Sequence, residues 1–378
     1  MNTANDTNSD VGTLVAANNR LGFELLSQLV DQDRDKNVFL SSFSVGLALA
    51  MTYNGAEGKT KEAMAQVLGL TELSLQEVNE ANAALMSMQE GLNPQIQIAI
   101  ANSIWVRPEI EPSADFIRRI RDCYAGQVTS LDFGDPGSAD VINEWVAGKT
   151  NDKIKELVTW GDISRALLVL INAIAFKGMW TTQFDEEKTE ERAFTLLDGS
   201  RKQHPMMSQS GRYDYYENKL FQAVSLPYGE GRVSMVVFLP RPTTSMDEFL
   251  ETCTAENWQA WMSRFHETKG DVVLPRFKVE YGVDLLPELV ALGGEEFAGK
   301  DFLGMGAGPL VISKVIHKTF VEVNEEGTEA AAATAVIMER GGTFRFRMIV
   351  DHPFFCAIRD NETGTLLFMG LVVDPTED

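Results

Sequence analysis

The segment that decides the fold of this chain reads Glu325-Glu326-Gly327-Thr328-Glu329-Ala330-Ala331-Ala332-Ala333-Thr334-Ala335-Val336-Ile337-Met338-Glu339-Arg340-Gly341-Gly342. Its four consecutive alanines favour a helix when they are considered alone. Read with a period of two, however, the alternate residues from Thr328 to Val336 are all small or β-branched, so one face of a strand could be buried. Gly327 tolerates backbone angles that other residues avoid, which suits a hinge. The segment could therefore stand as an exposed loop and later enter a sheet as a strand.

Two stretches near the C-terminus carry further motifs. They read Asp351-His352-Pro353-Phe354-Phe355 and Leu367-Phe368-Met369-Gly370-Leu371-Val372. Together with the run from Asn324 to Ala332, they closely resemble the serpin family, and the resemblance extends over about residues 11–375. The alternative for the alanine-rich run alone is a flexible linker. The resemblance implies a reactive-loop hinge made of Glu325, Glu326, Gly327, Thr328, Glu329, Ala330, Ala331, Ala332, Ala333 and Thr334.

The order of predicted elements indicates an α+β fold with antiparallel or mixed sheets. Residues 166–176 are apolar on both faces, which is typical of a central strand covered on two sides. Ile96, Ile98, Ile100, Asn102 and Ile104 alternate with smaller residues, as in a half-buried strand. The resemblance implies the serpin fold, with three β-sheets, a large central mixed sheet, about eight or nine helices and an exposed reactive-centre loop at about residues 325–345.

The chain reads as one domain. Its 378 residues would allow two domains, but no Pro-, Gly- or Ser-rich linker divides them. Residues 1–10 are polar and acidic, and we expect them to form a disordered N-terminal tail. Residues 11–378 are then a single serpin-like domain.

The charge of the chain excludes several classes of partner. The net charge is −22, so nucleic acid and anionic membrane surfaces would be repelled. By resemblance, residues 74–91 correspond to the helix with which many serpins bind sulfated glycans, yet this segment contains no Lys or Arg. We therefore expect no heparin or other glycosaminoglycan partner and no cofactor, and we expect a monomer.

The cysteines and the N-terminus favour a cytoplasmic protein. Cys123, Cys253 and Cys356 are few, odd in number and far apart, which argues against a disulfide framework. Residues 1–10 lack the basic start and apolar core of a secretory signal. No apolar stretch is long enough to span a bilayer. An extracellular location stays open if a signal peptide has been removed.

No enzyme or metal site is evident in the sequence. It contains no G-x-S-x-G motif. Its four histidines, His204, His266, His317 and His352, are scattered without H-E-x-x-H or Cys/His metal spacing. We therefore predict a protein that is not an enzyme and binds no metal.

The resemblance implies two structural sites around the main sheet. Ser41, Ser44, Asn172 and His317 would form a buried polar cluster that holds the sheet closed but separable. The alternative for His317 is an ordinary satisfied core histidine. Trp180 would lie at the top of the sheet where the loop enters. Arg276 would pair with Glu325, and the alternative is an exposed pair that contributes about 0–1 kcal/mol.

The implied function is suicide inhibition of a serine protease. The usual family spacing from Gly327 places the scissile bond at Gly341-Gly342, but glycine offers a protease no side chain. Arg340-Gly341 presents a cation suited to an acidic specificity pocket, which favours a trypsin-like target. Met338 remains an alternative for chymotrypsin- or elastase-like enzymes. Inhibition of a cysteine protease, a non-inhibitory carrier or chaperone, and an unrecognised enzyme also stay open.

Overall fold

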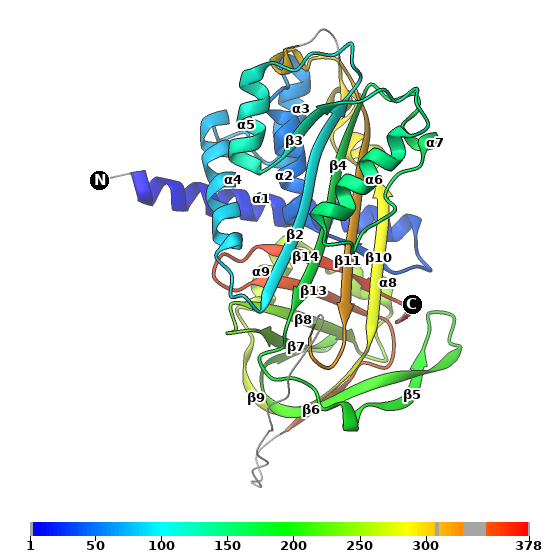
Figure 1. The fold of residues 1–378 in the computed structure, drawn as a ribbon. Helices are drawn as coiled ribbons and strands as arrows, with labels where there is room; N and C mark the ends of the chain where they lie inside the picture. The colour runs from blue at the N-terminus through cyan, green and yellow to red at the C-terminus, as the bar shows by residue number, and fades with distance from the viewer. Residues whose placement is uncertain (1–2, 307–309, 328–344, 377–378) are drawn as a thin grey trace.

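The computed structural model describes residues 3–306, 310–327 and 345–376. These residues form ten α-helices, three short 3-10 helices and fourteen strands (Figure 1). The helices are α1 (Thr3–Gln32), α2 (Ser42–Tyr53), α3 (Gly58–Leu68), α4 (Leu75–Glu90), α5 (Ala114–Tyr124), α6 (Ser138–Lys149), α7 (Trp160–Ile163), α8 (Met246–Leu250), α9 (Ala255–Met262), α10 (Leu286–Gly293), η1 (Glu186–Lys188), η2 (Glu295–Ala298) and η3 (Leu303–Met305). The strands are β1 (Val38–Leu40), β2 (Ile96–Val106), β3 (Gln127–Ser130), β4 (Leu168–Gly178), β5 (Glu190–Thr195), β6 (Arg201–Glu217), β7 (Phe221–Tyr228), β8 (Val233–Pro240), β9 (His266–Pro275), β10 (Phe277–Asp284), β11 (Ile312–Val323), β12 (Phe346–Ile349), β13 (Phe354–Asp360) and β14 (Leu366–Val372).

A five-stranded mixed sheet runs through the molecule in the order β10-β11-β4-β2-β3. Strand β11 pairs antiparallel with β10 and parallel with β4. Strand β2 pairs antiparallel with β4 and parallel with β3. All residues of β4 except Lys177 are buried, because helices cover the sheet on both faces. This explains why its sequence reads as an apolar run that only Asn172 interrupts before Lys177.

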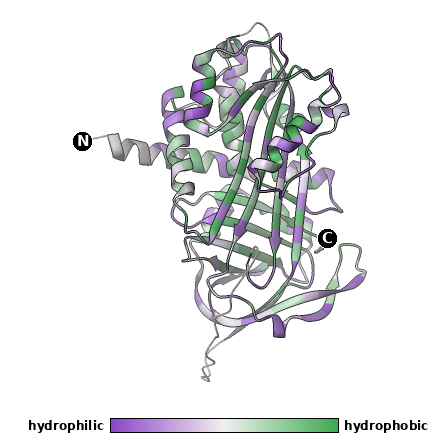
Figure 2. Cartoon of the chain, in the orientation of Figure 1, coloured by the Kyte–Doolittle hydropathy of each residue, from purple (hydrophilic) through white to green (hydrophobic). Residues whose placement is uncertain are grey.

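Two clusters of apolar side chains lie on the two faces of this sheet. Leu168, Leu170, Ile174 and Phe176 of β4 belong to the larger core, which also contains residues of α1 and α2. Val169, Ile171, Ala173 and Ala175 of β4 belong to a smaller cluster that includes residues of α6. Figure 1 shows α6 on the front face of the sheet and α2 behind it, and Figure 2 shows the strands coloured largely as hydrophobic.

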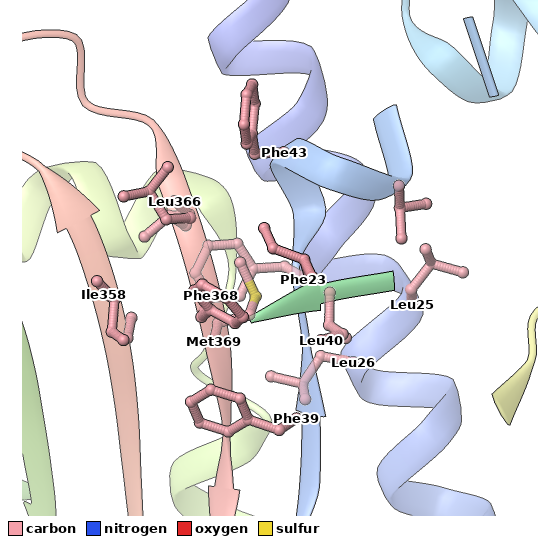
Figure 3. Packing of buried hydrophobic residues seen from close by; sticks show 14 of the residues in the cluster. Phe23, Leu25, Leu26, Phe39, Leu40, Phe43, Ile358, Leu366, Phe368 and Met369 are labelled. Atoms are coloured by element: carbon pink, nitrogen blue, oxygen red, sulfur yellow. The ribbon is translucent and has the colours of Figure 1, made fainter. Parts of the chain in front are cut away.

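The larger core continues into the second sheet. Strand β1 pairs antiparallel with β14. The rings of Phe39 and Phe368 are fully buried there, with their centroids 6.0 Å apart. Figure 3 shows Phe23 and Leu26 of α1 packed against the same group of side chains. Burying one large apolar side chain contributes about 1.5–3 kcal/mol, so these contacts join α1, β1 and β14 firmly.

The second sheet has nine strands in the order β1-β14-β13-β8-β7-β6-β9-β12, with β5 paired to β6. Strand β6 is 17 residues long and pairs with β9, β7 and β5. The three predicted sheets are therefore two hydrogen-bonded sheets within the described residues, because β6 is long enough to connect two of them.

Two smaller predictions differ from the structure. The expected eight or nine helices are ten α-helices in the described residues, since α7 and α8 are too short to show a helical period. The predicted disordered tail, residues 1–10, is wrong from Thr3 onward, where α1 begins. Extending a helix that is already docked through Leu14, Leu21 and Leu25 fixes one residue for each added hydrogen bond. Among the described helices, none has the length and apolarity that crossing a membrane requires.

Candidate functional site

His317 lies on β11 directly opposite Asn172 of β4. The backbone N–H of Ser41 donates to His317 Nε2 at 3.1 Å. Because Nε2 accepts this bond, the proton of the neutral ring is on Nδ1, which donates to Asn172 Oδ1 at 2.5 Å. The ring is fully buried, and burial lowers the pKa of the imidazole to about 3. His317 is therefore neutral at ordinary pH.

The N-terminus of α2 lies beneath the boundary between β4 and β11, which we call the seam. Asn172 Nδ2 donates to the backbone oxygen of Ser44 at 3.0 Å and to its Oγ at 2.5 Å. Ser41 Oγ caps the helix by accepting from the Ser44 N–H at 3.1 Å. The structure thus brings together all four residues of the predicted cluster, on two strands and one helix end.

Two further residues join this polar row, and the sequence analysis did not assign either of them to it. Asn102 of β2 lies opposite Asn172, and its Oδ1 accepts from Asn172 Nδ2 at 2.5 Å. Thr319 Oγ1 donates to the backbone oxygen of Phe39 at 2.9 Å. A polar residue inside the alternating isoleucines of β2 is a signal that could have pointed to Asn102. Its position beside Asn172 depends on a strand register that the sequence does not show.

The chain reverses direction just after β11. Asn324 and Gly327 exchange backbone hydrogen bonds of 2.8 and 3.3 Å. Gly327 also forms an antiparallel bridge with Met179, just past the end of β4. Its φ is 136°, and a Cβ atom here would lie 2.2 Å from the backbone oxygen of Gly178. The close approach and the positive φ together require glycine.

Trp180 fixes this turn from the side of β4. Its Nε1 donates to the backbone oxygen of Asn324 at 2.9 Å, and its backbone N–H donates to that of Glu326 at 3.0 Å. The indole stacks on the Tyr228 ring with centroids 4.2 Å apart. The predicted entry residue therefore contacts the beginning of the hinge.

Arg276 and Glu325 form the predicted pair. Arg276 Nε lies 2.8 Å from both carboxylate oxygens of Glu325, and its Nη2 lies 2.7 Å from Oε1. Thr189 donates a further hydrogen bond to the carboxylate. The Glu325 side chain is only 4% exposed, compared with 33% for Arg276. The alternative, an exposed ion pair that contributes about 0–1 kcal/mol to stability, does not describe this contact, because the Glu325 carboxylate is buried.

The remaining predicted residues lie outside the described residues. These are the hinge residues from Thr328 to Thr334 and the candidate cleavage residues Met338, Arg340, Gly341 and Gly342. The described chain resumes at Arg345 and enters β12, which pairs parallel with β9. The two ends of the intervening segment are thus rooted in different sheets (Figure 1).

Comparison with known proteins identifies the family. The family model described as Serpin (serine protease inhibitor) matches residues 16–375. The chain belongs to the serpin family. It is 39% identical over 378 residues to Serpin B6 of Macaca fascicularis, covering 96% of this chain and 99% of the relative. It is 34% identical to an uncharacterized serpin-like protein of Methanosarcina acetivorans, covering 96% and 88% of the two chains.

Solved serpin structures share the fold. The native state of tengpin, a thermophilic serpin, is 30% identical and superposes with a TM-score of 0.87, covering 95% of this chain and 94% of tengpin. Native protease nexin-1 with heparin is 27% identical with a TM-score of 0.85, covering 98% and 100%. The predicted serpin fold is confirmed. Within the described ranges, no group of three or more His, Cys, Asp or Glu residues is placed to hold a metal ion.

Proposed function

We propose that this serpin inhibits a serine protease as a suicide substrate. The protease attacks a peptide bond in the loop at about residues 325–345 and forms an acyl-enzyme. The freed loop then enters the five-stranded sheet between β4 and β11, and the attached protease is carried along and distorted. The observation that carries this proposal is the backbone pairing of Gly327 with both Asn324 and Met179 at the end of the seam.

This pairing defines the register that an entering strand would follow. His317 and Asn172 are partners across the parallel seam. Asn324 follows His317 by seven residues and Met179 follows Asn172 by seven residues, so the same register places Asn324 opposite Met179. An antiparallel strand moves one residue forward for each residue that its partner moves back. Seven residues beyond Gly327, Thr334 would therefore lie between Asn172 and His317. When β4 and β11 separate, the hydrogen bond between His317 and Asn172 is broken. The Thr334 hydroxyl could then form a hydrogen bond in its place.

The same register assigns the two faces of the entering strand. The alternate residues from Thr328 to Val336 would face the larger core, as Leu170, Ile174 and Phe176 do. They are small or β-branched, so nothing bulky or charged opposes their burial. Glu329 would lie on the other face beside Lys177, with opposite charge. The sequence of the segment therefore suits rapid insertion, which favours an inhibitor over a protease substrate.

Insertion would replace one parallel strand boundary with two antiparallel ones. Parallel pairing is slightly less stable for each residue, and each new backbone hydrogen bond contributes about 1 kcal/mol. The native state is then a kinetically trapped form above a more stable inserted form.

The length of β4 favours cleavage at Arg340-Gly341. In the register set by Gly327, Met338 would come to lie opposite Leu168, the first residue of β4. Cleavage after Arg340 would leave the complete inserting strand and two more residues to reach the protease. A trypsin-like enzyme matches the arginine. Gly341-Gly342 and the bond after Met338 remain the alternative sites.

The proposal is tested by mixing the protein separately with trypsin, chymotrypsin, elastase and a papain-like cysteine protease. We expect an SDS-stable complex with trypsin and a released fragment that begins at Gly341. An Ala332→Arg variant places a large cation on the inserting face, so it should be cleaved without forming the complex. A Glu329→Gln control changes the other face and should still form it. Cleavage of the wild type without a complex would instead indicate a non-inhibitory serpin.

We further propose that the protein acts without heparin, as a monomer in a reducing compartment. Although protease nexin-1 was crystallised with heparin, the segment corresponding to α4 here contains no Lys or Arg. Cys123, Cys253 and Cys356 are not joined in disulfides, and the last two are buried. Retention on a heparin column at physiological salt, or a dimer by light scattering, would contradict these points.

A further inference from the structure

Half of strand β2 has no strand beside it on one side. It pairs with β4 from Ile96 to Val106, but β3 pairs with it only from Ser103 to Val106. Among the described elements, no strand and no further backbone hydrogen bond reaches the remaining edge, residues 97–101, which we call the open edge. Figure 1 shows no strand to the left of the lower half of β2. The N–H and C=O groups of the open edge can therefore pair with one additional strand.

The open edge exists because the chain enters β3 late. Helix α5 ends at Tyr124, and the chain reaches β3 at Gln127, opposite Ser103. A Cβ atom on Gly126 would lie 3.6 Å from the backbone oxygen of Asn102, so this turn marks one end of the open edge. Five residues at about 3.4 Å each give a length of roughly 17 Å, which accommodates a short extended segment.

The open edge lacks the features that protect most edge strands. Such strands commonly carry charged residues, proline or a bulge, which hinder pairing with another chain. The opposite edge strand of the same sheet, β10, follows this rule with Lys278, Glu280 and Asp284. In contrast, residues 96–106 of β2 contain no charged residue and no proline, and their pairing with β4 is regular. The open edge is thus suited to pairing with another strand.

The side chains of the open edge suit a segment with alternating apolar residues. Ile98 and Ile100 lie on one face of β2 and are only partly buried against the larger core. Met88 of α4 is partly buried against the same core. On the other face, Ala99 is small and Gln97 is exposed. An added strand would place β-branched side chains beside the two isoleucines, as cross-strand neighbours.

The charge around the open edge favours a basic partner. From Glu62 to Val106, the chain contains five glutamates and no Lys or Arg, and this stretch includes all of α4 and β2. Glu77 and Glu80 are exposed on α4. Because the whole chain has a net charge of −22, an acidic partner or a second copy of this chain would be repelled.

We propose that the open edge is a docking site for an extended, basic segment of another protein. The segment pairs with β2 as an added edge strand beyond the end of β3. In this mode of binding, main-chain hydrogen bonds supply affinity and alternate side chains supply specificity. The open edge and the seam lie on different sides of β4, so the proposal does not depend on the inhibition proposed above.

The test uses a fluorescent peptide, blocked at both termini, with a lysine at each end and alternating valine and threonine between them. Uncut full-length protein is titrated with this peptide, with a form that has glutamate at each end, and with a form whose internal backbone amides are all methylated. Ile98→Lys places a cation beside the open edge. Leu197→Lys is the matched control, because Leu197 is 47% exposed in the turn between β5 and β6.

We expect the lysine-ended peptide to bind and to slow hydrogen exchange in residues 97–101. Binding should weaken by at least about tenfold for Ile98→Lys, for the glutamate-ended peptide and for the methylated peptide. Leu197→Lys should bind as the wild type does. If Ile98→Lys does not fold, the two modified peptides still decide the question with the wild-type protein.

Several outcomes would overturn the proposal. They are no binding of the lysine-ended peptide, equal binding of the methylated form, and protection of β4 and β11 alone, which would mean that the peptide enters the seam. A dimer protected at residues 97–101 without peptide would assign the open edge to a second copy instead. No protease is involved, so failure here is separate from failure to inhibit.

Discussion

At the scale of single residues, the structure links stability to the protonation of His317. Its ring has no room for a second proton, because Nε2 faces the Ser41 N–H and burial lowers the pKa to about 3. Below the unfolded-state pKa of about 6.5, the unfolded chain binds a proton that the folded chain does not. Between about pH 6.5 and 3, this residue therefore makes the free energy of unfolding fall as the pH falls, by up to about 1.4 kcal/mol per pH unit.

We predict that His317→Ala lowers the free energy of unfolding near pH 7 by about 1–3 kcal/mol, because the Ser41 N–H loses its partner. The variant should also show a shallower loss of stability between pH 6.5 and 3 than the wild type. Urea unfolding at several pH values measures both effects. His266→Ala, which removes an exposed histidine, is the control. Equal pH slopes in wild type and His317→Ala would contradict the assignment.

His352 has the opposite pH dependence. Burial opposes its charge, but the hydrogen bonds of its ring to Asp351 Oδ1 and to the backbone oxygen of Pro240 raise its pKa above the usual value. A raised folded-state pKa contributes stability below about pH 6.5 that is lost as the pH rises through the folded pKa. The two histidines therefore act in opposite directions, and only variants can separate their contributions.

The buried Glu325 carboxylate makes its contact with Arg276 sensitive to charge. Glu325→Lys places two cations together at a site where the glutamate side chain is 4% exposed. Breaking a buried pair costs about 3–5 kcal/mol, and the lower end applies because Arg276 is 33% exposed. We predict a lower Tm and faster polymerisation or spontaneous loop insertion, measured by native gels after mild heating. In contrast, Asp31→Lys at the exposed Arg34 pair should change the stability by less than about 0.5 kcal/mol.

At the scale of elements, the turn after β11 depends on one glycine. Gly327→Ala would push a methyl group to within 2.2 Å of the Gly178 backbone oxygen, so the bridge to Met179 should be lost. We predict that more of the variant is cleaved as substrate and less forms the protease complex, measured as the stoichiometry of inhibition. Gly199→Ala is the control, since Gly199 has a positive φ of 80° but no atom near its Cβ position. An unchanged stoichiometry for Gly327→Ala would show that the turn does not guide insertion.

The elements also show what the sequence could and could not predict. The two-sided apolar run of β4 and the alternating isoleucines of β2 were sufficient to predict both strands, because burial imposes their patterns. The serpin resemblance supplied the grouping of Ser41, Ser44, Asn172 and His317. Asn102 was missed, since its place in the row depends on pairing between strands far apart in the chain. The continuity of β6 through two predicted sheets was missed for the same reason.

At the scale of the whole molecule, the proposed inserted form should be the more stable one. The eleven residues from Thr328 to Met338 would each add about 1 kcal/mol of backbone hydrogen bonding. A long chain takes the lower end of the usual shift, about 2 °C for each kcal/mol, so we predict that cutting the loop raises the Tm by roughly 20 °C. Calorimetry of intact and trypsin-cut protein at equal concentration measures this difference. Equal melting temperatures would remove the energetic basis of the proposed inhibition.

The seam has chemically different ends. Beside Gly327, it ends at a turn that already follows the register of an additional strand. At the opposite end, the Leu167 N–H donates to Ser313 Oγ at 2.9 Å, which ties the two strands together. In the proposed insertion, loop entry would consequently have a polarity, because Thr328 would enter first and Met338 last. Loop entry competes with deacylation of the acyl-enzyme, so substitutions early in the segment should slow entry before the protease has moved. Later substitutions should affect only the final distance that the protease travels.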